Sequence, residues 1–186
     1  MSEMFQARIQ TEILDFINSR QSLQLATAGK DGLPYASYSP FATDNGQVFV
    51  LLSEIAIHAS NLLENPHASL LIIQDEDSAE ELFARVRVNY QATATHIEFE
   101  APDWKQGINC LAERHGERIH NLAKLADFKL FKLQPTGGRF VKGFGKAFDI
   151  VGNGLSGYEI KHLRGGHTKR TSPETDTPSS KATSAA

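Results

Sequence analysis

Two arginines near the middle of the sequence are spaced so that they could bind one anion together. Arg85 and Arg87 lie in the run 82–89, which we expect to form a strand whose side chains alternate between its two faces. Both guanidinium groups would then share a face and could hold a carboxylate or a phosphate through paired hydrogen bonds. The alternative interpretation is an ordinary solvated strand face.

A second candidate is His58, which lies in the segment 53–62 between a predicted strand and a predicted helix. Backbone amides at the start of a helix favour anions, so a phosphate or a carboxylate could dock there. The pattern alone favours a simpler interpretation, in which His58 is a helix cap or a packed imidazole.

The glycine-rich run 137–147 suggests a phosphate-binding loop at first sight. It does not match the GxxxxGK[ST] pattern, and it holds no GxGxxG between a strand and a helix. Glycines at alternate strand positions more often mark bulges or a close approach of two backbones. We therefore interpret these glycines as structural.

Two histidines lie near the end of the chain. The five-residue spacing of His162 and His167 does not place both on one helix face, so it does not indicate a two-histidine metal site. The segment 168–186 has no Val, Ile, Leu or aromatic residue, and Ser, Thr and Pro fill 11 of its 19 positions, which predicts a disordered tail. His167 borders this tail, where it could be merely exposed or could ligate a cofactor.

Composition excludes several classes of protein. The 186 residues correspond to one domain with a tail, since domains average roughly 150 residues. A net charge of −3 argues against nucleic acid as a partner, and the single cysteine, Cys110, excludes a disulfide framework. The sequence shows neither a secretory signal nor an apolar run long enough to cross a bilayer, so we expect a cytoplasmic protein without membrane contact.

Hydrophobic periodicity predicts the elements that must position these residues. It indicates an amphipathic N-terminal helix within 1–20, further helices at 56–63 and 101–125 with a break at Gly116, and a solvated charged run at 113–118. Strands are expected at 22–28, 34–42, 47–53, 68–74, 82–96, 127–134 and 139–150. The first three would form a meander, and a turn at 135–138 would join the last two. This pattern predicts an α+β fold, mainly β, with an antiparallel barrel or sandwich.

Several segments in this order resemble the HutZ/HugZ family of haem-utilisation proteins, part of the FMN-binding, pyridoxamine-phosphate-oxidase-like split-barrel group. The segments that carry the resemblance are Leu23-Gln24-Leu25-Ala26-Thr27, Ser37-Tyr38-Ser39-Pro40-Phe41, His58-Ala59-Ser60-Asn61-Leu62, Leu82-Phe83-Ala84-Arg85-Val86-Arg87, Glu113-Arg114-His115-Gly116-Glu117, Ala126-Asp127-Phe128-Lys129-Leu130-Phe131-Lys132-Leu133-Gln134-Pro135, Phe140-Val141-Lys142-Gly143-Phe144-Gly145 and His162-Leu163-Arg164-Gly165-Gly166-His167. They cover nearly the whole predicted domain, 21–167.

The resemblance implies a homodimeric split barrel with two haem sites at the subunit interface. It implies that His167 is the axial ligand of the haem iron and that Asp127, contributed by the other subunit, hydrogen-bonds this histidine. Such a carboxylate fixes the tautomer of the imidazole and makes its metal-binding nitrogen more basic. Arg87 would lie near the haem as a polar partner, with Arg85 and His58 as lesser candidates.

Three functions follow as expectations. The first is a haem-degrading oxygenase that releases iron and uses an external electron donor; the others are an FMN-binding oxidoreductase and a non-catalytic haem carrier or store. The flavin relatives usually place Arg or Lys just beyond the serine that ends the third strand, whereas Ser53 is followed by Glu54 here. A phosphate without a fixed cation loses charge-assisted hydrogen bonds, which weakens the flavin hypothesis unless Arg85 and Arg87 substitute.

Overall fold

The structure is a computed structural model that describes residues 2–163 and 165. His167 and the predicted tail 168–186 lie outside the described residues. The chain begins with helix α1 (Glu3–Asn18), which is capped by the Ser2 hydroxyl accepting a hydrogen bond from the amide of Phe5. This helix buries Ile9, Ile13 and Ile17, whose spacing of four residues places them on one face.

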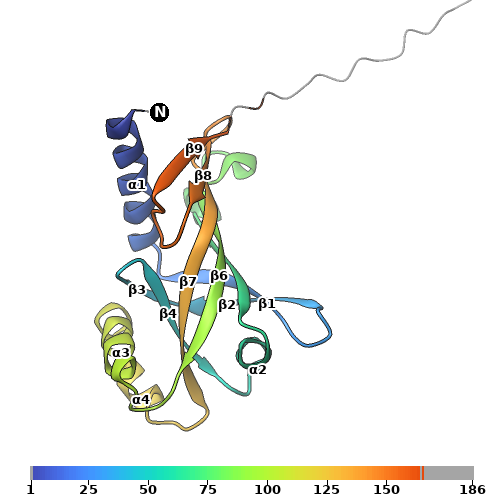
Figure 1. Cartoon of the computed structure of the whole chain (residues 1–186), viewed down its shortest axis with the longest axis vertical. Coiled ribbons are helices and arrows are strands. Elements are labelled where there is room, and N and C mark those ends of the chain that lie inside the picture. Colours follow the sequence, from blue (N-terminus) through green and yellow to red (C-terminus); the bar gives the residue numbers. More distant parts are fainter. Residues whose placement is uncertain (1, 164, 166–186) are drawn as a thin grey trace, which may run out of the picture.

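A single antiparallel sheet forms the rest of the framework (Figure 1). Its nine strands are β1 (Ser22–Ala28), β2 (Pro34–Pro40), β3 (Ala42–Asp44), β4 (Gln47–Ser53), β5 (His67–Ile73), β6 (Arg87–Ile97), β7 (Phe128–Val141), β8 (Ala147–Val151) and β9 (Glu159–His162). The spatial order is β2-β1-β5-β6-β7-β4-β3, with β8 and β9 continuing from β7. The prediction of a mainly β, antiparallel split barrel is confirmed.

The long strand β7 explains why the barrel is split. One of its edges pairs with β6 along almost its whole length, whereas its other edge pairs first with β4 and then with β8. In Figure 1, β6 and β7 rise through the molecule from the end near α4 to the end near β8 and β9. The two ends of this strand pair therefore belong to different parts of the fold.

Three further helices cover parts of the sheet. They are α2 (Ile57–Glu64), α3 (Pro102–His115) and α4 (Arg118–Leu122), and the break between the last two falls at Gly116 as predicted. One core lies inside the barrel beneath α1, and a second core lies under α3 and α4 against β4 and β7. No helix in the described part of the chain is long and apolar enough to cross a membrane.

Two predictions of strand connection are wrong. The first three predicted strands do not form a meander: β1 pairs with β2 as expected, but β4 pairs with β3 and β7 and not with β2. The predicted turn at 135–138 is part of β7, and the chain reverses at 142–146. Pro135 and the glycines that follow are typical of a turn, but they also fit a strand whose neighbours lie very close to its backbone.

The reason for glycine at position 138 is a close backbone contact. A Cβ atom added there would lie 2.4 Å from the carbonyl oxygen of Asn89 and 2.6 Å from the ring of the fully buried Tyr90. The interpretation of these glycines as structural agrees with this geometry, and a register shift in the β6–β7 pair follows at Gln91.

We expect Gly138→Ala to destabilise the fold by about 1–3 kcal/mol, because the added methyl group forces two paired strands apart. The measurement is the free energy of unfolding in urea. Gly165→Ala is the control, since a Cβ atom at Gly165 meets nothing within 4 Å and should leave the stability unchanged. An unchanged stability for Gly138→Ala would contradict the contact.

The prediction of a solvated face over 113–118 is wrong for Arg114. Arg114 donates hydrogen bonds to the carbonyl oxygens of Ile17, Asn18 and Arg20, and its guanidinium lies 4.9 Å from the centre of the Phe41 ring. These carbonyl groups at and just beyond the C-terminus of α1 lack partners within that helix, so Arg114 caps it from a distant part of the chain. Sequence spacing alone carries no sign of this contact.

Candidate functional site

One face of the sheet remains open as two adjoining grooves of about 620 and 550 Å³, which share Leu71 and Asn89. Strand residues alternate, so Val88 and Tyr90 of β6 enter the barrel core while Arg87, Asn89 and Gln91 face these grooves. The larger groove is lined by Leu71, Arg87, Asn89, Gln91, Gly137, Gly138, Arg139, Val141 and Asp149. The smaller is lined by Gln24, Leu25, Ala26, Ala36, Ser37, Ser69, Leu71 and Asn89.

Arg87 is the cation best placed to receive an anion in the larger groove. Its guanidinium donates a hydrogen bond to the carbonyl oxygen of Arg85 at 2.9 Å, and among the described residues it has no carboxylate partner. The residue is half-buried, so solvent screens its charge less than that of a fully exposed arginine. An anion bound in the groove would give the Arg87 guanidinium a charged partner.

Arg85 does not share this face, and the predicted clamp of two neighbouring arginines is wrong. Strand β6 begins only at Arg87, because the residues Leu82–Ala84 form a short 3-10 turn that the side chain of Glu81 caps. The guanidinium of Arg85 turns to the carbonyl oxygen of Gln74 and to Glu76 Oε1, 3.0 Å away. A role for Arg85 in cofactor binding stays a prediction. Each of its three guanidinium nitrogens already donates a hydrogen bond within the chain.

His58 is a packed imidazole in the first turn of α2, where no side chain caps the helix. Its Nδ1 lies 3.0 Å from Ser37 Oγ, and this hydroxyl donates to the carbonyl oxygen of Leu25. Since the hydroxyl has one proton, Nδ1 must donate to Ser37, which leaves Nε2 unprotonated. Burial lowers the pKa of His58 and favours this neutral form.

Asp127 immediately precedes β7 and is held in place by the end of β4. Its Oδ2 accepts a hydrogen bond from Ser53 Oγ at 2.9 Å, and its carbonyl oxygen accepts one from the amide of Glu54. These contacts fix the carboxylate while leaving Oδ1 without a partner in the described part of the chain. The sequence pattern marks Ser53 only as the end of a strand and gives no sign that this residue orients Asp127.

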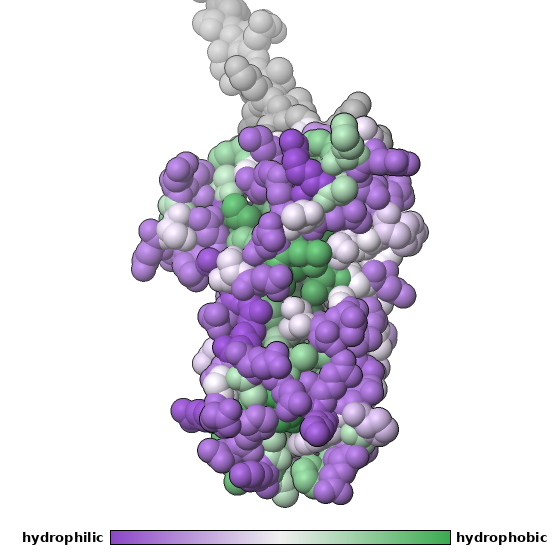
Figure 2. Space-filling model, turned by 90° about the vertical axis from the view of Figure 1, so that its left-hand side faces the viewer, coloured by the Kyte–Doolittle hydropathy of each residue, from purple (hydrophilic) through white to green (hydrophobic). Residues whose placement is uncertain are grey.

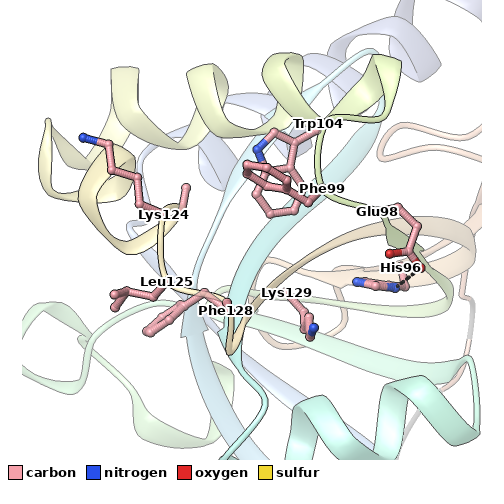
Figure 3. Close-up of a pocket in the computed structure, with 10 residues that line it drawn as sticks. His96, Glu98, Phe99, Trp104, Lys124, Leu125, Phe128 and Lys129 are labelled. Carbon is pink, nitrogen blue, oxygen red and sulfur yellow. Dashed lines mark ion pairs between the residues drawn. The ribbon is translucent and has the colours of Figure 1, made fainter.

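A recess of about 260 Å³ lies beside Asp127 and was not foreseen from the sequence (Figure 3). The rings of Phe99 and Trp104 meet edge to face at 5.2 Å, and His96 pairs with Glu98 to one side of them. The remaining lining residues are Ala123, Lys124, Leu125, Ala126, Phe128 and Lys129. The available signal was a pair of aromatic residues flanking a helix start, one of which, Phe99, is 63% exposed.

One chain does not bring Asp127 and Arg87 together. Asp127 precedes the first residue of β7, whereas Arg87 pairs in register with Val141, the last residue of that strand. Thirteen strand steps of about 3.3 Å each give β7 a contour of about 43 Å. Asp127 and Arg87, both expected at the haem site, therefore lie at opposite ends of the long β6–β7 pair (Figure 1).

The described residues offer few other groups that could hold a metal ion or act as a nucleophile. They contain no group of three or more His, Cys, Asp or Glu side chains arranged to hold a metal ion. Cys110 is half-buried on α3, and burial raises the pKa of its thiol, which makes it a poor nucleophile at neutral pH. Figure 2, which views the molecule from the side of α1 and α3, shows a largely polar surface with a smaller apolar area near its middle.

The split barrel and its open sheet face indicate the class of protein to which this chain is similar. The sequence model of the pyridoxamine 5′-phosphate oxidase family matches residues 9–142. The chain is 45% identical to the heme oxygenase HutZ of Vibrio cholerae over 167 residues, which cover 90% of this chain and 94% of that protein.

Solved structures agree with this placement. A crystal structure of Vibrio cholerae HutZ, described as a heme storage protein, is 46% identical, with a TM-score of 0.68 over 71% of this chain and 93% of that one. Campylobacter jejuni ChuZ is 29% identical, with a TM-score of 0.79 over 89% of this chain and 67% of that one. The chain belongs to the pyridoxamine-phosphate-oxidase-like split-barrel family and, within it, to the HutZ/HugZ family of haem-utilisation proteins.

Proposed function

We propose that this protein binds haem on its open sheet face and degrades it oxidatively to release iron. The observation that carries the proposal is the 45% identity, over nine tenths of the chain, to a relative named a heme oxygenase. Another description of the same relative calls it a storage protein, so a haem carrier or store is the second candidate. The predicted external electron donor and cytoplasmic location stay predictions.

The groove fits the chemical character of haem. Haem is a planar, largely apolar ring system with two carboxylates at one edge. Leu71 and Val141 supply apolar surface, the two glycines leave room beside them because they carry no side chain, and Arg87 supplies a cation without a carboxylate partner among the described residues. The volume of about 620 Å³ lies within the range of small-molecule sites, roughly 300–1,000 Å³.

The long β7 strand supports a site shared by two copies of the chain. His167 follows Leu163 by four residues, and four residues of chain reach at most about 14 Å. Leu163 hydrogen-bonds to Ala147, at the end of the sheet where Arg87 lies and far from Asp127. An antiparallel pairing of two sheet faces would bring Asp127 of one copy to the Arg87 end of the other, an arrangement that is compatible with a two-fold symmetric homodimer.

Each proposed residue has a distinct task in such a shared site. His167 would bind the iron, and Asp127 of the other copy, held by Ser53, would accept the remaining ring N–H of His167 and keep the imidazole in one tautomer. Arg87 would bind a propionate carboxylate or donate hydrogen bonds to a ligand of the haem. The bound haem supplies the redox chemistry with oxygen, and the protein supplies orientation and charge.

The FMN alternative finds less support in the geometry. Glu54 follows Ser53 at the position where flavin relatives usually carry a cation. The carboxylate of Glu54 also forms an ion pair with the nearby Lys129, with Oε2 and Nζ 3.4 Å apart. Arg85, which could have substituted, is already bound to Glu76. A flavin phosphate at the start of α2 would therefore lie near a carboxylate, and of the two arginines that could substitute only Arg87 is without a carboxylate partner among the described residues.

Absorption spectra of the purified protein, with and without added haemin, test the proposal. We expect a Soret band that saturates with haemin and, after addition of a reductant in air with catalase present, a loss of that band with release of chelatable iron. A stable Soret band under these conditions would favour the carrier. A yellow flavin spectrum without haemin binding would contradict the proposal.

A further inference from the structure

We propose that Arg139 is a second carboxylate-binding residue of the larger groove and that Arg87 and Arg139 together select a ligand with two carboxylates. The inference rests on the proposed function and specifies which part of haem the groove recognises. It replaces the expected pairing of Arg87 with Arg85 by a pairing across two strands.

The register of β6 and β7 places both guanidinium groups on one face. Arg87 lies opposite Val141 and Asn89 lies opposite Arg139, so the two arginines are diagonal neighbours. Diagonal Cβ atoms on a sheet face lie about 7–8 Å apart, within reach of long side chains. Both arginines line the same groove, with the apolar Val141 beside them.

Each arginine is tied to an acceptor of its own, which keeps the two guanidinium groups from converging on one point. Arg87 donates to the carbonyl oxygen of Arg85, and Arg139 donates from Nε to Asp149 Oδ1 at 2.8 Å. The two terminal nitrogens of Arg139 have no other partner among the described residues. Two separated donors suit two carboxylates better than a single phosphate.

The ion pair with Asp149 orients Arg139 without consuming its binding capacity. The side chain of Arg139 is 56% exposed and that of Asp149 is 34% exposed, so solvent weakens their attraction. The two arginines and Asp149 together carry one net positive charge. A ligand with two carboxylates can bind both guanidinium groups, whereas a neutral ligand of the same shape cannot.

The test compares haemin with haemin dimethyl ester, which keeps the ring system and loses both carboxylates. We expect Arg139→Gln to weaken haemin binding about 10-fold, the equivalent of one charge-assisted hydrogen bond. Binding of the ester should not change, and Arg139→Lys should fall between the wild type and Arg139→Gln. Arg8→Gln is the matched control, because Arg8 is an exposed arginine on α1, paired with Glu12, and should leave both affinities unchanged.

The outcomes separate this inference from the proposed function. Equal weakening for haemin and the ester would mean that Arg139 shapes the groove without binding a carboxylate, and it would overturn the inference. Unchanged haemin affinity in Arg139→Gln would overturn it as well. If the wild-type protein binds neither compound, the proposed function fails first and the inference fails with it.

Discussion

Replacing His167 by alanine should weaken the affinity of the protein for haemin by about 100-fold or more. The loss of a hydrogen-bonding partner of a metal ligand costs about 10–100-fold, so the loss of the ligand itself should cost at least as much. The measurement is a haemin titration followed at the Soret band. Added imidazole should restore a six-coordinate or five-coordinate histidine-type spectrum to the variant, because it supplies the missing nitrogen.

His162 provides a matched control five residues earlier. Its ring stacks on Phe148 with centres 4.9 Å apart, and its Nε2 lies 3.2 Å from the carbonyl oxygen of Gly145, so its place in β9 is accounted for by packing. His162→Ala should therefore leave haemin affinity nearly unchanged. An unchanged affinity in His167→Ala, or a loss confined to His162→Ala, would contradict the assignment of the iron ligand.

Replacing Asp127 by asparagine should slow haem degradation by about 10–100-fold while haemin affinity changes little. The amide has the shape of the carboxylate and can still accept the hydrogen bond from Ser53, so the loop before β7 should keep its conformation. What the variant loses is negative charge beside the proposed imidazole ligand, which makes that imidazole a weaker donor to iron. A lower iron–histidine stretching frequency in the resonance Raman spectrum should accompany the slower turnover.

Ser53→Ala separates the charge of Asp127 from its structural contact. This variant removes the hydrogen bond to Oδ2 and keeps the carboxylate, so its effect on turnover should be smaller than that of Asp127→Asn. If Ser53→Ala slows turnover as much as Asp127→Asn and the iron–histidine frequency stays constant in both, Asp127 merely shapes the loop. Normal turnover in Asp127→Asn would remove the proposed tuning role altogether.

The sequence predicted the types of element well because most of their signals are local. The spacing of Ile9, Ile13 and Ile17 depends only on the period of a helix, and Gly116 ends α3 because it adopts a φ of 86°. The resemblance then identified the split barrel, which no single segment determines. The comparisons confirm the family on the same stretch of chain.

The errors have two causes, a short turn that interrupts a predicted strand and long-range pairing between strands. Local alternation in 82–89 predicted a shared face for Arg85 and Arg87, but the capped turn at Leu82–Ala84 delays the strand until Arg87. Likewise, Pro135 and the glycines that follow read as a turn, although pairing with two neighbouring strands keeps β7 extended.

The candidate site was foreseen only in part for the same reason. The resemblance indicates Asp127, and both strand alternation and the resemblance indicate Arg87, but the separation of the two residues along β7 emerges only from the register of the sheet. The partnership of Arg87 with Arg139 joins residues 52 positions apart in sequence, and the contact of Ser53 with Asp127 joins residues 74 positions apart. Single-sequence periodicity carries no information on contacts of that range.

The most direct test of the shared site mixes two inactive subunits. A heterodimer that pairs a His167→Ala chain with an Asp127→Asn chain contains one site with both native residues and one site with neither. We predict that this heterodimer degrades haem at about half the wild-type rate per dimer, since one of its two symmetric sites is intact, whereas each variant homodimer stays strongly impaired. A heterodimer no more active than the two homodimers would show that both residues act within one chain, and it would contradict the account.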